Sequence, residues 1–283
     1  MTRPGLRCLW LPALCACGRI GFDAPEPDCV EPQPVDQVCL GMPIASNGSL
    51  PGGGVWFPLD EANPVAGIRD ASNTYEARCT GSCPVSALGA RGTGKGLRFV
   101  TQQLRISGLP DPGASSGYTI AVWASLDILP RDTNPLPTQY SCALSKPNKT
   151  LIPNPPFNDG NSYALCVEPS NRTYVYTTSD TRADGLIAAD GHGRISNVAE
   201  WHHLAATWDA VCRTQVLYFD GCRVNARTGI DIRFDPGEVF VGADNLGTST
   251  ASPSYYWNGT LDDIVIYNRA LDDAEIQQLV GHR

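Results

Sequence analysis

The sequence is short of positive charge, of methionine and of long apolar runs. Its 283 residues hold 21 Lys and Arg against 29 Asp and Glu, a net charge of −8, so the basic surface of a nucleic-acid-binding protein is missing. No segment reaches about 18 consecutive apolar residues, which excludes a transmembrane helix. Two Met beside 28 Gly and 23 Pro indicate many turns and few long helices. We therefore expect an acidic, turn-rich protein whose partners are not nucleic acids.

The first 16 residues have the order of charged and apolar residues that is typical of an export signal. Arg3 and Arg7 precede a short apolar run over residues 8–16, which contains no acid and is too short to span a bilayer. The tetrapeptide LCAC ending at Cys17 resembles the bacterial lipobox, and the following GRIGFDAP resembles the same position in myxobacterial lipoproteins. This resemblance implies that residues 1–16 are removed and that Cys17 carries lipid; the alternative is a conventional signal.

Cysteine is abundant, with 11 residues in the chain, and this number indicates an oxidising compartment. Once the signal and the lipid-bearing Cys17 are set aside, an even number remains, as disulfides require. These eight are Cys29, Cys39, Cys79, Cys83, Cys142, Cys166, Cys212 and Cys222.

Two of the disulfides follow from expected geometry. The runs YSCALS and SYALCVE are typical of neighbouring antiparallel strands, which would bring Cys142 opposite Cys166. Cys79 and Cys83 flank a short turn and can close a small loop.

The remaining four cysteines are less constrained. Cys29 and Cys39 are candidates for a further small loop near the N-terminus. Cys212 and Cys222 flank the expected strand RTQVLYF, whose rise would place them roughly 30 Å apart. Bonded Cα atoms lie within about 7 Å of each other, so we predict that Cys212 and Cys222 do not bond to each other.

The chain divides into a tether and a body. Residues 17–50 are rich in Pro and Gly and show no periodicity, which predicts a semi-rigid tether. Residues 51–283 hold short runs of β-branched and aromatic residues separated by turn signals, as in a β-sandwich or barrel. The runs span residues 55–59, 96–100, 103–109, 118–128, 140–145, 162–168, 173–178, 201–208, 215–220, 238–243 and 261–267.

Three local patterns refine this all-β prediction. The run at 118–128, YTIAVWASLDI, is apolar on both faces, which favours a strand in the middle of two packed layers. Asp220-Gly221 predicts a two-residue hairpin turn. Asp272 followed by Glu275 predicts a capping box and therefore one short C-terminal helix.

The strand sequences carry a family likeness over residues 50–282. GLRFV, YTIAVWASLDI, WHHLAATWD, LYFDG and GTLDDIVIYNRALDDAEIQQL resemble, in this order, the landmarks of the laminin-G-like jellyroll domain of the concanavalin A-like lectin/glucanase superfamily. The resemblance implies a two-sheet antiparallel β-sandwich with a role in binding rather than chemistry. It also implies that one Ca²⁺ often lies at the rim.

The calcium ligands implied by the resemblance are Asp70 in the first loop and Asp262 at the start of the last strand, with Asn73 as a helper. Loops at one end of a sandwich can bring such oxygen ligands together. The alternative is that Asp262 caps a turn and Asp70 is solvated.

Glycoside hydrolases share this superfold and are the rival interpretation. Many of its glucanases carry Glu-x-Asp-x-x-Glu on one strand, which supplies two close carboxylates, and this sequence lacks the pattern. Asp262 and Asp263 are adjacent and would point to opposite faces of a strand. We therefore expect no enzymatic activity.

Together these patterns predict an exported, lipid-anchored module on the cell surface that binds a glycan or a surface protein, with Ca²⁺ ordering its rim. Membrane contact would come from the N-terminal lipid alone; a secreted or periplasmic protein is the alternative. Tyr255, Tyr256 and Trp257 are the candidate ligand contacts, although core packing is the competing interpretation of such aromatic residues. A structural envelope protein without a ligand and a glycoside hydrolase are the alternative functions.

Overall fold

A computed structural model describes residues 50–61, 63–92, 94–110, 116–130, 140–148, 161–176, 187–188, 193–232, 234, 236–244 and 255–281. The predicted signal and tether, with Cys17, Cys29 and Cys39, lie outside these residues, apart from Leu50. Among the described residues, no helix is both long enough and apolar enough to cross a membrane.

The described residues form a sandwich of two antiparallel sheets, as the sequence predicts. Its first sheet contains eight strands in the order β14-β13-β12-β7-β16-β5-β4, with β1 also paired to β16. Their bounds are β1 Val55–Phe57, β4 Val85–Leu88, β5 Lys95–Phe99, β7 Tyr118–Leu126, β12 Trp201–Asp209, β13 Thr214–Phe219, β14 Cys222–Arg227 and β16 Gly259–Tyr267.

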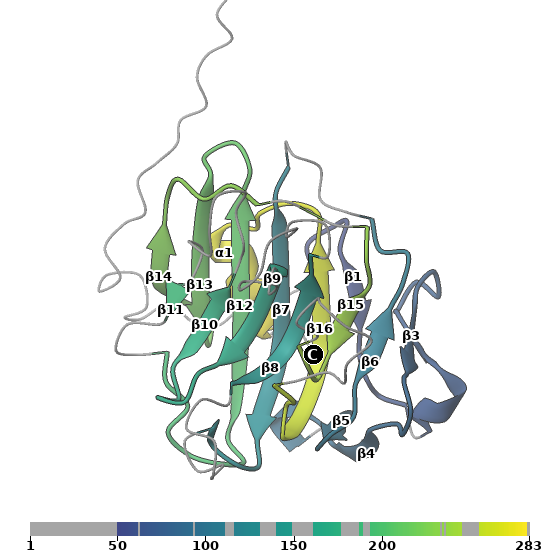
Figure 1. Cartoon of the computed structure of the whole chain (residues 1–283). Helices are drawn as coiled ribbons and strands as arrows, with labels where there is room; N and C mark the ends of the chain where they lie inside the picture. The colour runs from purple at the N-terminus through teal and green to yellow at the C-terminus, as the bar shows by residue number, and fades with distance from the viewer. Residues whose placement is uncertain are drawn as a thin grey trace, which may run out of the picture.

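The second sheet also contains eight described strands, in the order β11-β10-β9-β8-β15-β6-β3-β2. It lies in front of the first sheet in Figure 1, with β11 and β14 at one side of the sandwich and β3 at the other. The bounds are β2 Ile68–Arg69, β3 Glu76–Cys79, β6 Leu104–Ile106, β8 Ser141–Pro147, β9 Asn161–Val167, β10 Thr173–Tyr176, β11 Ile187–Ala188 and β15 Val239–Val241.

The main core lies between the two sheets, where alternate residues of each strand meet. Strand β7 is central in the first sheet, between β12 and β16, and all nine of its residues are buried. Its Ile120, Val122 and Leu126 face the core. The expectation from the sequence that this strand is covered on both sides is confirmed.

A second apolar cluster covers the outer face of the first sheet. Helix α1 (Asp273–Gly281) packs Ile276 and Leu279 against Ala205, Tyr218 and other outward residues of that sheet. The helix therefore closes a face that would otherwise expose apolar surface to water.

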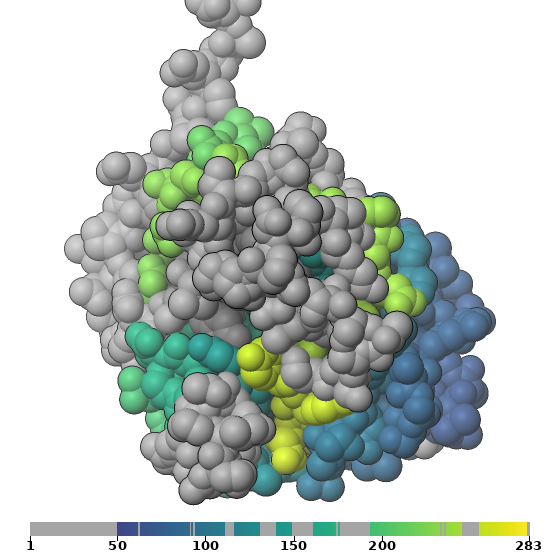
Figure 2. All heavy atoms as spheres, viewed as in Figure 1, coloured from purple at the N-terminus to yellow at the C-terminus, as the bar shows by residue number. Residues whose placement is uncertain are grey.

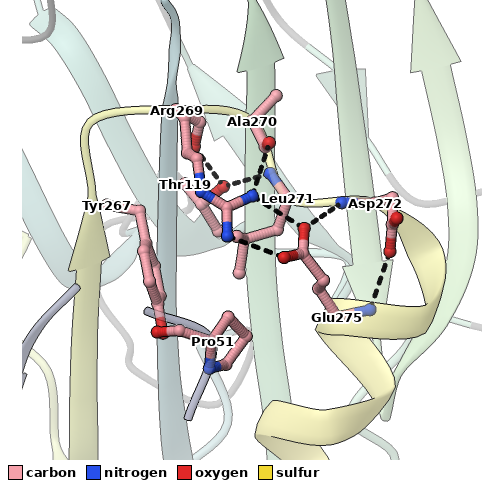
Figure 3. Close-up of polar contacts among 8 residues, drawn as sticks. All are labelled: Pro51, Thr119, Tyr267, Arg269, Ala270, Leu271, Asp272 and Glu275. Atoms are coloured by element: carbon pink, nitrogen blue, oxygen red, sulfur yellow. Dashed lines mark hydrogen bonds and ion pairs between the residues drawn. The ribbon is translucent and has the colours of Figure 1, made fainter. Parts of the chain in front are cut away.

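The predicted capping box begins this helix. The backbone N–H of Asp272 donates to the Glu275 carboxylate at 3.1 Å, and the Glu275 N–H donates to Asp272 Oδ1 at 2.8 Å. Figure 3 shows that Arg269 also binds Glu275, at 2.6 and 2.8 Å. Thr119 on β7 ties the preceding turn down, since its hydroxyl donates to the Arg269 carbonyl and accepts from the Leu271 N–H.

The predicted hairpin turn is confirmed as well. Asp220 and Gly221 join β13 to β14 with φ of 52° and 79°, the left-handed values that a tight two-residue turn requires.

Both disulfides predicted from turn and strand geometry are present: Cys79–Cys83 and Cys142–Cys166. The second joins directly opposed residues of β8 and β9, as the sequence predicts. Two short 3-10 helices, Pro64–Ala66 and Ala90–Gly92, complete the described elements.

Candidate ligand-binding groove

A polar groove lies on the outer face of the second sheet, over β3, β6 and the segment that leads into β15. Pairing places Arg78 of β3 opposite Arg105 of β6, and Arg105 opposite Phe240 of β15. Because side chains alternate along a strand, Ala77 and Ile106 enter the core while this row points outward. The groove has a volume of about 390 Å³ and is lined by Thr74, Tyr75, Glu76, Arg78, Thr80, Arg105, Ser107 and Glu238.

One wall of the groove is an ion-pair cluster around Glu76. Its carboxylate accepts a hydrogen bond from Arg78 at 3.1 Å and lies 3.5 Å from Arg69. The hydrogen bond from Arg78 and the nearby positive charges lower the pKa of Glu76. Glu76 therefore stays ionised at neutral pH and presents acceptor oxygens.

The opposite wall is organised by Arg105. Its guanidinium lies 3.4 Å from Glu238 and 5.1 Å from the centre of the Phe240 ring, and Ser107 donates to Glu238 at 2.7 Å. The Nε of Arg105 is buried and has no hydrogen-bond partner among the described residues. This nitrogen is closed to solvent, whereas the side chain as a whole is 35% exposed, so the terminal guanidinium nitrogens are the donors that a ligand oxygen can reach.

The loop that carries Thr74 and Tyr75 into the groove is held by Asp70. The Asp70 carboxylate accepts from the Tyr75 N–H at 2.6 Å and from the Ser72 N–H at 3.0 Å. Burial acts to raise the pKa of Asp70, but these hydrogen bonds, with one from the Ser72 hydroxyl, lower it overall. Asp70 therefore acts as an anion that fixes the loop beside the groove. Its side chain is only 3% exposed, so the alternative to calcium binding, that Asp70 is solvated, is wrong.

The predicted calcium ligands have other contacts in this structure. Both oxygens of Asp70 accept from its own loop, and Asn73 donates its N–H to the Asp70 carbonyl at 2.9 Å. Asp262 accepts from the N–H groups of Ala90 and Asp263, at 2.8 and 2.9 Å. The described residues contain no group of three or more His, Cys, Asp or Glu that could hold a metal. Calcium binding stays a prediction.

Asp262 has a different environment from the groove acids. It is 5% exposed on the covered side of the first sheet, and burial, with a smaller contribution from the charge of Asp263, raises its pKa to about 8. Its neighbour Asp263 accepts from the Trp56 indole at 2.9 Å. The strand is bulged here, with Asp263 at φ 47°, and Trp56 packs against the outer apolar cluster, so the strict alternation that predicted opposite directions does not hold.

The three predicted aromatic contacts separate in the structure. Tyr255 and Tyr256 are partly exposed, and Tyr255 packs edge-on against Tyr140 at 5.3 Å beside the Cys142–Cys166 disulfide. The prediction that Trp257 contacts a ligand is wrong, because this residue is fully buried in the main core. Its indole N–H donates to the Ser125 carbonyl at 3.1 Å. Core packing, the competing interpretation, accounts for this residue.

Comparison with protein families places the fold. Residues 100–277 match a laminin G family model described as the concanavalin A-like lectin/glucanases superfamily. The match covers more than half of the chain, so the chain belongs to this superfamily. A search of curated proteins finds no match.

Solved structures with a similar fold include enzymes and binding domains. Domain 4 of AbnA, a GH43 extracellular arabinanase from Geobacillus stearothermophilus in complex with arabinotriose, has a TM-score of 0.55 at 17% identity, covering 80% of this chain and 97% of that domain. Trypanosoma rangeli sialidase in complex with sialic acid has a TM-score of 0.56 at 16% identity, covering 87% of this chain. The binding domain of botulinum neurotoxin serotype D has a TM-score of 0.53 at 13% identity, covering 81% of this chain and 51% of that domain.

The chain spans about a third of the sialidase, 36% of its length, and identities this low show a shared fold alone. They nevertheless contradict the expectation that the chain is not an enzyme, because sialidases and an arabinanase are prominent among the similar structures. The fold serves both enzymes and binding modules. The lack of Glu-x-Asp-x-x-Glu on one strand does not exclude a hydrolase, since acids from different strands can also converge.

The sequence did not indicate the groove itself. None of its main residues was predicted as a site residue: Tyr75, Glu76, Arg78, Arg105 and Glu238. The alternation of charged and apolar residues in EARC and LRI is the signal that could have identified two strands with one charged face.

Proposed function

We propose that this protein is an exported, lipid-anchored surface module that binds a glycan in the groove between β3 and β6. The observation that carries the proposal is the groove lining, in which two arginines lie beside two glutamates within one cavity of about 390 Å³. This volume falls in the usual range for small-ligand sites.

The chemistry of the lining suits a hydroxyl-rich ligand. Each sugar hydroxyl both donates and accepts hydrogen bonds, and the groove offers two guanidinium groups beside two carboxylates. Arg78 and Arg105 balance Glu76 and Glu238 in charge, which favours a neutral glycan over a strongly charged one.

A similar domain supports the class of ligand. The arabinanase domain, matched over 97% of its length, is in complex with arabinotriose. This makes short neutral oligosaccharides the first ligands to test here.

The cell-surface address has separate support. Two disulfides within the described body are expected of a protein that folds in an oxidising compartment. The export-type segment at residues 1–16 and the lipobox-like LCAC at Cys17 support a lipid anchor at the membrane surface.

The test is a binding measurement on the chain with Cys17→Ser, exported into an oxidising compartment so that the disulfides form. A glycan array that includes arabinotriose and sialylated glycans, with and without calcium, identifies ligands, and calorimetry gives affinities. We expect Arg105→Met to lower the affinity at least tenfold, because it keeps the aliphatic stem on Phe240 and removes the donors.

The matched control is Arg98→Ala. Arg98 also forms an exposed ion pair, with Asp127 at 2.6 Å, but it lies on the first sheet, away from the groove. Equal loss of affinity in both variants, or no binding of any glycan, would overturn the proposal. Release of shortened sugars from a bound oligosaccharide would instead assign a hydrolase activity.

A further inference from the structure

A second groove lies on the first sheet, between β12, β13 and the segment that joins β16 to α1. It has a volume of about 500 Å³. Its polar centre is Asp273, which accepts from the Tyr218 hydroxyl at 2.7 Å and from Arg223 at 2.8 and 3.0 Å. The lining residues are Thr207, Asp209, Cys212, Thr214, Val216, Tyr218, Arg223, Ala270, Leu271, Asp272, Asp273 and Ala274.

Cys212 in this lining and Cys222 on β14 are both disulfide-bonded. They are not bonded to each other, because pairing places Cys222 opposite Phe219 while Cys212 precedes the other end of β13. The six extended residues of β13, Thr214–Phe219, separate these ends by roughly 17 Å, well beyond the limit of about 7 Å for bonded Cα atoms. The observed bounds and pairing of β13 thus agree with the sequence-based prediction about this pair.

Their partners must lie before Leu50. The other four described cysteines are used in the Cys79–Cys83 and Cys142–Cys166 bonds. All remaining cysteines of the chain fall within residues 8–39.

The position of Leu50, the first described residue, agrees with partner cysteines that precede it. Leu50 packs against the apolar cluster that contains Val216, Tyr218 and Leu271, three residues of the groove lining. The Tyr267 hydroxyl donates to the Pro51 carbonyl at 2.8 Å, beside the segment that leads to α1 (Figure 3). The preceding residues therefore start from the side of the second groove.

We propose that the segment before Leu50 docks along the β13–β14 hairpin and that Cys29 and Cys39 bond to Cys212 and Cys222. The choice of Cys29 and Cys39 rests on the proposed export, since removal of residues 1–16 and acylation of Cys17 leave these two. The ten residues from Cys29 to Cys39 can span about 33 Å when extended, enough to reach both ends of the hairpin.

The test is peptide mapping of the exported full chain by trypsin under non-reducing conditions, with free thiols blocked first. Trypsin sites place Cys29 and Cys39 together in peptide 20–69, Cys212 in 195–213 and Cys222 in 214–223. We expect one product that contains all three peptides and separates on reduction. Cleavage by an endoprotease on the N-terminal side of Asp36 then divides the two bonds and assigns each partner.

Other products would overturn the proposal. An intact mass of peptide 20–69 that is two hydrogens short, free of other peptides, would mean a Cys29–Cys39 loop. Peptide 195–213 joined only to 214–223 would mean a Cys212–Cys222 bond. Neither result depends on glycan binding. The peptide map can therefore contradict the disulfide proposal without contradicting the proposed function, and the binding assay can do the reverse.

Discussion

The two outer faces of the sandwich shift the pKa of their carboxylates in opposite directions. On the covered face of the first sheet, burial beside Ala90 raises the pKa of Asp262 to about 8. On the outer face of the second sheet, Arg78 and Arg69 lower the pKa of Glu76. The same chemical group is thus held in a desolvated, structural setting on one face and in an ionised, solvent-accessible setting on the other.

The difference separates stability from recognition. The covered face is closed by α1, by Leu50 and by an apolar cluster, so its side chains contribute mainly to folding. The blue flank in Figure 2 carries β3 and β6 of the other face, where charged side chains line a groove. Substitutions should therefore affect stability on the first face and ligand affinity on the second.

The largest expected effect is on the covered face. Ile276 of α1 is fully buried in the apolar cluster, so Ile276→Ala should lower the free energy of unfolding by about 2–5 kcal/mol, measured by denaturant titration. The control is Leu88→Ala, because Leu88 is 66% exposed and should change stability by less than about 0.5 kcal/mol. Equal losses would mean that α1 does not close this face.

A smaller effect should appear in the pH dependence of stability. The Asp262 pKa is raised from 3.8 to about 8 on folding, so between these pH values the folded state holds a proton that the unfolded state has released. Raising the pH through this range should therefore destabilise the folded state, with the effect levelling off above about pH 8.

Asp262→Asn removes this titration and should flatten that part of the curve. The measurement is the unfolding free energy of both proteins at several pH values from 5 to 9. The change in slope is the readout, because the amide also alters the hydrogen bonds to Ala90 and Asp263. Parallel curves would show that Asp262 ionises normally in the folded protein.

The smallest effect on stability should come from the groove. Arg78 has a side chain that is 75% exposed and pairs with Glu76, and exposed ion pairs contribute about 0–1 kcal/mol. Arg78→Ala should therefore leave the thermal midpoint nearly unchanged while it weakens glycan binding. A large fall in the midpoint with unchanged affinity would reverse the distinction between the faces.

The sandwich was predictable because its longer strands carry their own signals. The run at Tyr118–Leu126 is apolar on both faces, and the Asp272 and Glu275 pair caps the helix in the expected manner. The short strands Glu76–Cys79 and Val85–Leu88 were not predicted, since EARC and VSAL contain few β-branched or aromatic residues and the alternation in EARC extends over only four residues.

The groove was not predictable for a different reason. It depends on register: Arg78 meets Arg105, and Arg105 meets Phe240, only because three strands far apart in sequence pair in this alignment. A shift of one residue would turn these side chains into the core. Trp257 was misassigned because an aromatic residue next to two tyrosines has the same sequence signal whether it packs inside or binds a ligand.

The strand order gives the molecule an orientation. Strands β14 and β11 close one side of the sandwich, whereas β3 lies at the other side (Figure 1). If Cys17 carries lipid and Cys29 is bonded to the hairpin, only 12 residues, at most about 43 Å of chain, separate the membrane from the β14 side. The glycan groove would then face away from the cell, toward whatever the surrounding medium or a neighbouring surface presents.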